Sequence, residues 1–554
     1  MAIKTYSELL SFKKKLVSWV EATVINKKLA QDSYVLFLSY GNINQRCQVW
    51  SSQDANIQKV IKRLLNFLDK LYTKNSSLTD FMKIDIAYNV EKKSWDQVCD
   101  LVNTQKHNNH MRKGISLDER FEISFLEQEI YGKAIVKGVV YNEPNFFDEK
   151  NLNDAIRKKY PNITKEFKLD KIRNAWLFDT YAAFYEDDGF IDLHSQGCEN
   201  GIRILNGNKK DHIKTLIKKN AHFLHNEIQS DGRFIYGYFP AYNREIKSYN
   251  TVRHCTAIYA LLETLEVDYK VEYLEKIKKS IQYAIDTFYK EIDGKGFMID
   301  GLADHLEIKL GSNATAIFML AKYQEITEDV QYVNYAEKLA QGIRSMVDEN
   351  GETIHVLHYP SLEVKEKFRI VYYDGEAALG LLRLYQINHD QELLNTVKLM
   401  FEHFISKNYD KYHDHWLSYC TNELTQICPE EKYFQFGINN YLKHMRFIAE
   451  RRTAYATFLE MMISAYKMVN RLKETEFPEL YQSAQFENLK ELIELRVEFQ
   501  RATGFFYPEM AMYMAKPSKI LNSFYVRHDR FRTRIDDQEH NLSGYVAYVN
   551  FFER

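Results

Sequence analysis

The chain has 554 residues, of which 45% are hydrophobic and 27% are charged, and this balance predicts a globular protein with a large core rather than a disordered chain. Lysine and arginine total 74 against 76 for aspartate and glutamate, so a net charge of −2 provides no general field to attract nucleic acid or an anionic membrane. Only 8 prolines and 21 glycines favour helices over a strand-and-turn architecture.

Cysteine usage and the N-terminus bear on where the protein works. The 6 cysteines are scattered without a Cys-x-x-Cys pair, which predicts reduced thiols and no disulfide framework. The N-terminus carries an acid at Glu8 and no apolar run before Lys13, unlike a signal peptide. No apolar run approaches the roughly 20 residues that span a bilayer. We therefore expect a cytoplasmic protein with no membrane span.

Residues 1–165 mix strand and helix patterns and predict a smaller α+β domain of unknown role. The elements expected there are strands at 34–40 and 46–50, a helix at 54–71, a strand at 82–88 and a capped helix at 94–102. This domain is large enough to fold by itself. It could gate a pocket, bind a polymer or make the protein a homo-oligomer.

Residues 166–554 repeat one local pattern, a short polar cluster that runs into an apolar helix. The clusters begin near Tyr249, Gly311, Tyr372 and Thr453, with a further polar start at His413. Comparable helical segments start at residues 257, 316 and 378, which are steps of 59 and 62 residues. Such a step accommodates two helices and their loops. Amphipathic segments at 273–289 and 333–347 predict outer helices between the apolar ones.

This pairing of inner and outer helices over residues 166–554 resembles an (α/α)6-type toroid. Many carbohydrate-active enzymes share that architecture, including glucuronyl hydrolases and the helical domain of glucuronyl C5-epimerases, and it also occurs in terpenoid cyclases and lanthionine cyclases. The resemblance is architectural and carries no diagnostic motif. It implies a mainly α protein in which the toroid, preceded by the α+β domain, is the catalytic part.

The polar starts of the apolar helices are the candidate site, because buried polar groups are costly unless they are paired or line a cavity. Helix N-termini that converge in a ring favour an anion. Arg253 could clamp an anionic group and His254 could move a proton, although a hydrogen-bonded core histidine is the alternative. We expect Tyr249, Asn250 and Asn313 to bind substrate.

The cluster at 372–376 places carboxylates and phenols at one helix start. Asp374 and Glu376 are candidate catalytic groups, since paired carboxyls with separated pKa values serve glycosidic cleavage. Tyr373 is expected to bind substrate. The alternative is that Asp374 caps the helix and Glu376 stabilises its first turn.

Two further clusters are predicted to bind substrate. In the first, Asp414, His415 and Trp416 could contact a sugar, and a metal shared by His413 and His415 is the alternative. In the second, Asp536, Asp537 and His540 precede a last apolar helix, and the alternative is a solvated salt-bridge network. No spacing matches a zinc signature, so no metal ligands are expected.

No glycine-rich phosphate loop of the GxxxxGK[ST] or GxGxxG type is present, and we expect no cofactor. The leading hypothesis is an enzyme that acts on a saccharide or glycan precursor, preferably an acidic one, by general acid/base chemistry in hydrolysis, elimination or epimerisation. One alternative is a cyclase or transferase that acts on an isoprenoid diphosphate or a peptide. The other is a non-catalytic glycan-binding or scaffold protein.

Overall fold

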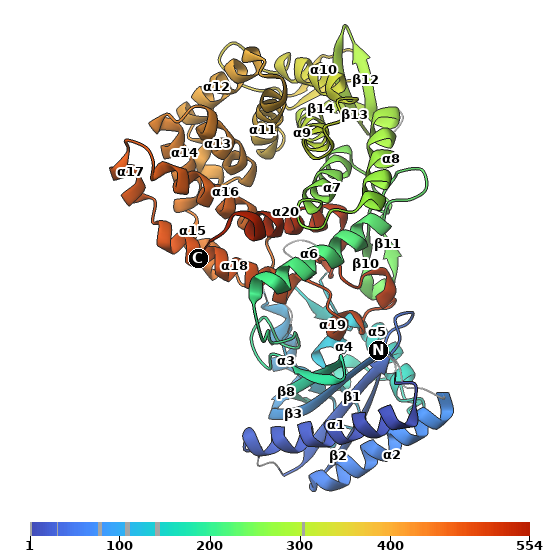
Figure 1. Cartoon of the computed structure of the whole chain (residues 1–554). Helices are drawn as coiled ribbons and strands as arrows, with labels where there is room; N and C mark the ends of the chain where they lie inside the picture. The colour runs from blue at the N-terminus through green and yellow to red at the C-terminus, as the bar shows by residue number, and fades with distance from the viewer. Residues whose placement is uncertain are drawn as a thin grey trace. The chain divides into compact units, whose positions relative to one another are not determined.

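A computed structural model describes residues 3–29, 32–75, 80–105, 111–138, 144–301 and 305–553 of the chain (Figure 1). The chain divides into two compact units. Unit 1 contains Met1–Gly207, Tyr238–Glu245 and Ala502–Thr533, and unit 2 contains Asn208–Gly237, Ile246–Arg501 and Arg534–Arg554. The chain therefore enters each unit three times.

This division differs from the boundary near residue 165 that the sequence predicts. Strand β8 (Asn174–Glu186) pairs antiparallel with β3 (Phe81–Ser94) and β4 (Gly114–Ser116), so the segment after residue 165 is part of the sheet of unit 1. Met512 and Tyr513 lie in a core cluster of the same unit. The boundary is corrected because pairing between distant segments places residues 166–207 and 502–533 in unit 1.

Unit 1 is built on a seven-stranded sheet in the order β2-β1-β3-β8-β4-β5, with β9 paired to β8. Its further strands are β1 (Tyr34–Gly41), β2 (Gln48–Asp54), β5 (Ser124–Phe125), β6 (Val136–Lys137), β7 (Phe146–Phe147), β9 (Gly189–Asp192) and β11 (Arg244–Glu245). Its helices are α1 (Tyr6–Asn26), α2 (Ile57–Asn75), α3 (Trp95–Asn103), α4 (Glu127–Gly132), α5 (Glu149–Lys159) and α19 (Pro508–Ala511). The predicted α+β character of this region is confirmed.

Strand β1 shows why this sheet is covered on both faces. Successive side chains of a strand point to opposite faces. Leu36 and Leu38 lie in the cluster that α1 and α2 complete, whereas Val35 and Phe37 lie in a second cluster with Phe178 of β8. The uninterrupted apolar run of β1 follows from burial on both sides.

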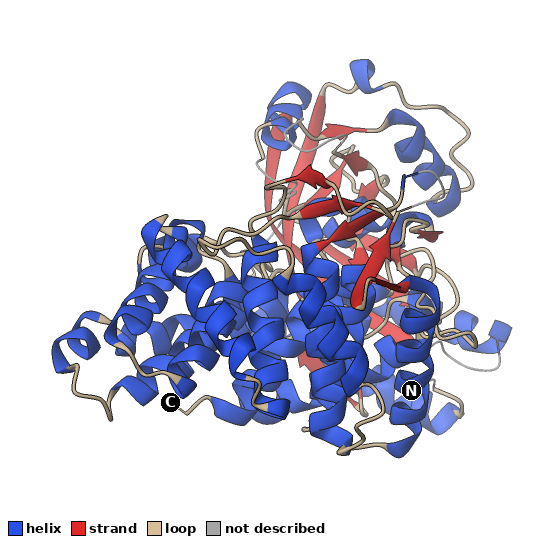
Figure 2. Cartoon of the chain, turned by 90° about the horizontal axis from the view of Figure 1, so that it is seen from above, coloured by secondary structure: helices blue, strands red, loops and turns tan. Residues whose placement is uncertain are grey.

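Unit 2 is dominated by helices (Figure 2). Six inner helices form a closed ring, in which each contacts the next and the last contacts the first (Figure 1). They are α7 (Thr251–Thr264), α9 (Leu310–Thr327), α11 (Tyr372–Asn388), α13 (His415–Ile427), α16 (Thr457–Leu472) and α20 (Ile535–Phe551). The predicted toroid is confirmed.

Outer helices flank this ring. They are α6 (Lys209–Asn226), α8 (Val271–Phe288), α10 (Val333–Arg344), α12 (Gln391–Ser406), α14 (Glu431–Leu442) and α18 (Phe486–Gly504), with the shorter α15 (Met445–Glu450) and α17 (Pro478–Ser483). An antiparallel sheet in the order β12-β13-β14-β15-β16 contains Tyr289–Ile292, Lys295–Asp300, Glu307–Lys309, Val356–His358 and Val364–Glu366. Strands β10 (Gly237–Phe239) and β17 (Thr533–Arg534) are short.

The inner helices are buried around their circumference. In α9 every residue from Leu310 to Tyr323 is buried, whereas α8 and α10 bury one face only. This difference is the one that the apolar and amphipathic patterns predict. Within the part of the chain that the structure describes, none of the helices has the length and hydropathy to cross a bilayer.

Candidate active site

A cavity of about 200 Å³ lies in unit 2 at the N-terminal ends of inner helices. Five of these helices contribute to its lining, namely α7, α11, α13, α16 and α20. The cavity is lined by Asn250, Val252, Arg253, Thr256, Ile370, Tyr372, Tyr373, Glu376, His415, Trp416, Thr457, Asp536, Glu539 and His540. Residues that are far apart in the chain therefore share one hollow.

The structure divides the predicted site residues into two groups. Those that line the cavity are Asn250, Arg253, Tyr373, Glu376, His415, Trp416, Asp536 and His540. Those that lie outside its lining are Tyr249, His254, Asn313, Asp374, Asp414 and Asp537.

His254 lies in the core and outside the cavity lining, as in the alternative of a hydrogen-bonded core histidine. It is fully buried, and its two ring nitrogens lie 2.7 Å from the Tyr249 hydroxyl and 3.0 Å from the Ser280 carbonyl oxygen. Burial lowers the pKa of His254 to about 4. Tyr249 accepts a hydrogen bond from the backbone N–H of Phe234 at 3.0 Å, so both side chains are engaged in supporting the start of α7.

Asn313 and Asp374 also have structural contacts. The Asn313 side chain accepts a hydrogen bond from the backbone N–H of Met298 at 2.8 Å and donates one to the Gly296 carbonyl, which joins α9 to β13. Asp374 accepts a hydrogen bond from the Thr353 hydroxyl and lies 3.2 Å from His355 Nε2. Asp374 and Asn313 are therefore engaged by partners within the protein interior and lie outside the cavity lining, unlike the positions predicted for them.

Asp414 and Asp537 lie beside the cavity lining. Asp414 is the N-cap of α13 and accepts hydrogen bonds from the backbone N–H groups of Trp416 and Leu417 at 3.1 and 3.2 Å. Its carboxylate is also 3.1 Å from His415 Nδ1. Asp537 is buried in the first turn of α20, and its backbone carbonyl accepts a hydrogen bond from Asn541. Asp414 therefore acts by positioning α13 and His415.

Two histidines form the centre of the site. The rings of His415 and His540 lie 5.1 Å apart between centroids, at an angle of 80°. Nδ1 of His540 lies 2.9 Å from a carboxyl oxygen of Glu460 and 3.2 Å from one of Glu539. Each imidazole thus has a carboxyl group on its Nδ1 side, which fixes the orientation of the ring.

The electrostatic surroundings give the two histidines different properties. Burial, reinforced by the nearby charge of His540, holds the pKa of His415 well below its usual range, so the ring is neutral near pH 7. Nε2 of His415 is buried and has no hydrogen-bond partner among the described residues. Burial raises the pKa of both Glu460 and Glu539 well above the ordinary range of a carboxyl group. Both carboxyl groups therefore favour their protonated forms, and both lie beside the His540 ring.

Glu376 presents a protonated carboxyl group to the cavity. Burial and the nearby carboxylate of Asp414 raise the pKa of Glu376 to about 8, against the lowering effect of Arg253. Burial likewise raises the pKa of Asp414 to about 8, although two N–H groups stabilise its ionised form. Glu376 Oε2 has no partner in the described part of the chain. The two N–H donors favour the ionised form of Asp414, whereas Glu376 Oε2 has no such donor.

Arg253 supplies a positive charge at the cavity wall. Its Nε donates to Asp536 at 2.9 Å and its Nη1 donates to the Tyr236 hydroxyl at 2.8 Å. The carboxylate of Asp536 is also paired with Arg534. Asp536 is thus paired with two guanidinium groups, and the guanidinium of Arg253 at the cavity wall suits an oxygen-rich or anionic group of a ligand.

Gly311 at the start of α9 allows Glu376 its position. A Cβ atom on Gly311 would lie 2.2 Å from Glu376 Oε2 and 2.5 Å from the Tyr373 ring, closer than atoms can approach. Only glycine therefore lets α9 approach the first turn of α11 at this point.

A metal ion would also fit part of this cavity. Single ligand atoms of His415, Glu460 and His540 all lie within 4.8 Å of one another. Imidazole and carboxylate are suitable ligands for zinc and for other transition metals. The sequence predicts no metal ligands here, whereas this cluster offers three, so the metal content of the protein is a property to measure.

The sequence interpretation missed several members of the site. Glu460 and Thr457 belong to α16, and Glu539 belongs to α20. An acid within the apolar run that follows Phe458 was the signal for Glu460, since a buried carboxyl group needs a partner. Glu539 adjoins the predicted His540 but was not assigned a role. Their association with His540 depends on the closure of the ring, which no local pattern reports.

Comparisons with known proteins find no matching family model and no matching curated protein. Among solved structures, the chain is similar to a D-mannose isomerase, with 11% identity and a TM-score of 0.46 over 62% of this chain and 99% of that chain. A cellobiose 2-epimerase from Bacillus thermoamylovorans gives 11% identity and a TM-score of 0.47 over 62% and 100%. An α-1,6-mannanase from Salegentibacter gives 12% and 0.42 over 60% and 98%. The expected architectural resemblance to an α/α toroid is confirmed by the closed ring of inner helices.

Proposed function

We propose that the protein is a sugar isomerase or epimerase that moves a proton at a carbon next to a carbonyl group. The observation that carries this proposal is the pair of imidazoles, His415 and His540, which face one cavity and are each oriented by a carboxyl group. Two positioned acid/base groups are what proton removal and proton return require. The volume of about 200 Å³ suits a ligand the size of a single sugar ring better than a larger one.

The reaction can be written from these residues. Neutral His415 accepts the proton of the carbon beside the carbonyl, and the electron pair of that C–H bond forms the double bond of an enediol. The carbonyl oxygen receives a proton from Glu376, and Arg253 stabilises the negative charge that develops on it. His540 then returns a proton to carbon. In epimerisation the proton returns to the opposite face of the same carbon, and the original carbonyl oxygen gives its proton back to Glu376. In isomerisation the proton returns to the former carbonyl carbon, and the hydroxyl on the other carbon of the enediol loses its proton to Glu376 and becomes the new carbonyl.

The predicted preference for an acidic saccharide remains part of the proposal. Arg253 and Arg534 share Asp536, which leaves positive charge for a carboxylate of a uronate. Hydrolysis and elimination are distinguishable from proton transfer because they change the mass of the product. The unpartnered Glu376 Oε2 and His415 Nε2 favour a site that awaits a ligand over a non-catalytic scaffold.

The proposal is tested by incubating the purified protein in D2O with neutral aldoses, ketoses and uronates. We expect deuterium at the carbon next to the carbonyl and a new epimer or isomer by NMR. His540→Asn should lower kcat by about 100-fold or more, within the range of general acid–base catalysis. His389→Asn is the matched control, since this histidine is exposed, lies at the opposite end of α11 and has a positive φ of 55° that asparagine tolerates.

Products without solvent deuterium, or equal activity of the two histidine variants, would refute the proton-transfer assignment. A second function is favoured by the three clustered ligand atoms of His415, Glu460 and His540, namely a metal-dependent lyase or cyclase. Elemental analysis of the purified protein and turnover after treatment with a chelator separate the two. Stoichiometric metal and loss of turnover with the chelator would favour the second function.

A cytoplasmic location also belongs to the proposal. It is supported by the six free cysteines at 47, 99, 198, 255, 420 and 428. Fractionation of cells that express the protein tests it, and recovery from a membrane or secreted fraction would contradict it.

A further inference from the structure

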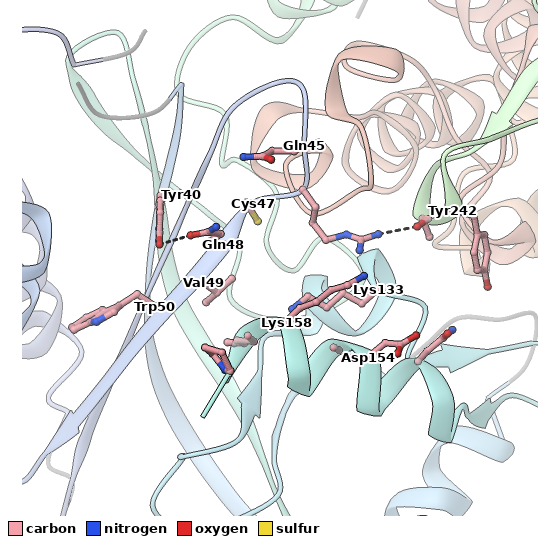
Figure 3. A pocket seen from close by; sticks show the side chains of 16 residues that line it. Tyr40, Gln45, Cys47, Gln48, Val49, Trp50, Lys133, Asp154, Lys158 and Tyr242 are labelled. Carbon is pink, nitrogen blue, oxygen red and sulfur yellow. Dashed lines mark hydrogen bonds between the residues drawn. The ribbon is translucent and has the colours of Figure 1, made fainter. Parts of the chain in front are cut away.

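Unit 1 contains a second, larger cavity of about 680 Å³ (Figure 3). It is formed by β1, by β2 and the loop before it, by the end of α4, by α5 and by residues 241–242. Its volume lies within the range of about 300–1,000 Å³ that is typical of small-molecule sites. The proposed reaction in unit 2 gives it no role.

Arg46 brings a poorly compensated charge to this cavity. Its Nε donates to the Tyr513 carbonyl at 2.9 Å and its Nη2 donates to the Ala241 carbonyl at 2.8 Å, so the guanidinium is held in place by backbone atoms. No carboxylate is paired with Arg46 among the described residues. Burial lowers the pKa of Arg46, as expected of a cation that lacks a counter-charge.

Two lysines beside Arg46 share a single carboxylate. Lys133 Nζ lies 3.1 Å and Lys159 Nζ lies 2.7 Å from the oxygens of Glu129, and the two lysine side chains are only 13% and 4% exposed. Burial lowers the pKa of Lys133, whereas Glu129 overcomes the effect of burial and raises the pKa of Lys159, so Glu129 compensates Lys159 better than Lys133. Positive charge is therefore concentrated at the cavity floor.

Lys158 adds a further cation at the rim, because it is exposed and lines the cavity (Figure 3). The acidic residue of the lining, Asp154, is already paired with Arg157. Four basic side chains line the cavity and only the carboxylate of Glu129 compensates them, so the net positive charge is greater than one. They are Arg46, Lys133, Lys158 and Lys159. A phosphomonoester, which carries about −1.5 to −2 at pH 7, compensates such an excess better than a lone carboxylate does.

An aromatic ring forms another part of the wall. Tyr242 lines the cavity beside Ala241, whose carbonyl holds Arg46, and its side chain is exposed (Figure 3). The rings of Tyr40 and Trp50 pack on Phe67 of α2 and belong to the other face of the sheet. An aromatic ring next to a basic group suits a ligand that joins an anion to a flat or apolar ring face.

We propose that this cavity of unit 1 binds a phosphomonoester that carries a ring, either a sugar phosphate or a nucleoside monophosphate. The phosphate contacts Arg46, Lys133 and Lys158, and the ring lies against Tyr242. The inference is independent of the proposed reaction in unit 2, so neither stands or falls with the other.

Isothermal titration calorimetry of the full chain tests the proposal with three probes: inorganic phosphate, glucose 6-phosphate and AMP. We expect at least one ringed phosphate to bind more tightly than inorganic phosphate, and glucose or adenosine without phosphate not to bind. Lys158→Glu should weaken binding at least 10-fold. Lys150→Glu is the matched control, because Lys150 is exposed on the same helix α5 but lies outside the cavity lining.

The ring contact is tested by Tyr242→Leu, at a side chain that is exposed and lines the cavity. This variant should weaken binding of the ringed phosphate towards that of inorganic phosphate, and a circular-dichroism melt like that of the unaltered protein establishes that it is folded. A tighter constant for glucose 6-phosphate assigns a sugar phosphate, and a tighter one for AMP assigns a nucleotide. Absence of binding by all three probes, or equal loss in Lys158→Glu and Lys150→Glu, overturns the proposal.

Discussion

At the residue scale, the proton on Glu376 is the property from which the proposed chemistry follows. Its pKa of about 8 comes from burial and from the neighbouring Asp414, and Glu376 lines the cavity while its Oε2 has no protein partner in the described chain. A carboxyl group that stays protonated at pH 7 can donate a hydrogen bond to a substrate oxygen. The same shift must appear in the stability of the protein.

We predict that Glu376→Gln removes the loss of folding stability that ionisation of Glu376 causes at high pH. The folded pKa of Glu376 is raised above its unfolded value, so its contribution is fully present below about pH 4.5 and is lost as pH rises through about 8. Glutamine does not titrate. The free energy of unfolding, measured by chemical denaturation, should therefore increase in the variant relative to the unaltered protein between pH 5 and pH 9, by on the order of 4 kcal/mol. A difference that is constant with pH would contradict the assignment.

Activity should report the same group. The rate is expected to fall above about pH 8 in the unaltered protein, because Glu376 loses the proton that it donates. Glu376→Gln keeps a hydrogen-bond donor but cannot transfer a proton, so this limb of the pH profile should disappear while kcat falls. Measured pH–rate profiles of both proteins decide this. An unchanged alkaline limb in the variant would assign the titration to another group.

At the scale of elements, the close approach of α9 to the first turn of α11 depends on glycine at position 311. Gly311→Ala would place a Cβ atom against Glu376 and Tyr373. We expect kcat to fall, because α9 or α11 must shift and displace Glu376. Glycine-to-alanine substitution inside a helix otherwise stabilises by about 0.5–1 kcal/mol, so a loss of thermal stability would indicate the clash. A stabilised variant with full activity would contradict it.

Strand β3 contains a buried ion pair whose disruption has a defined cost. Lys83 Nζ donates to the Asp85 carboxylate at 2.6 and 2.7 Å, both side chains are fully buried, and the Thr180 hydroxyl donates to the same carboxylate. Asp85→Ala leaves a buried ammonium without its partner, and we expect a loss of about 3–5 kcal/mol in urea denaturation. Asp69→Ala, which breaks the more exposed pair with Lys13, is the control and should cost about 1 kcal/mol or less.

At the scale of the whole molecule, the chain builds unit 1 from distant segments. Residues 502–533 supply Met512 and Tyr513 to its core, and Glu509 pairs with the buried Arg203 at 2.7 Å. We predict that a fragment of residues 1–207 does not fold cooperatively, because it lacks these partners. A fragment in which residues 238–245 and 502–533 are joined to it through flexible linkers should recover dispersed NMR spectra. Dispersed spectra and a cooperative melt of residues 1–207 alone would contradict the prediction.

Local sequence patterns were enough to predict the helical repeat and several residues of the site. Polar starts followed by apolar segments predicted inner helices and placed Arg253, Glu376, His415 and His540 at their N-termini, since helix period and burial are local properties. The tertiary structure decided which of these groups meet. His254 and Asp374 have the same local pattern but are occupied by hydrogen bonds within the interior.

The contact of His540 with Glu460 forms only because the last inner helix closes the ring, so the sequence pattern did not predict it. The return of residues 502–533 to unit 1 was not predicted either. Contacts of this kind join residues separated by tens to hundreds of positions. Their free energy depends on packing that no sequence window contains, whereas the tendency of each segment to form a helix or a strand resides in the segment itself.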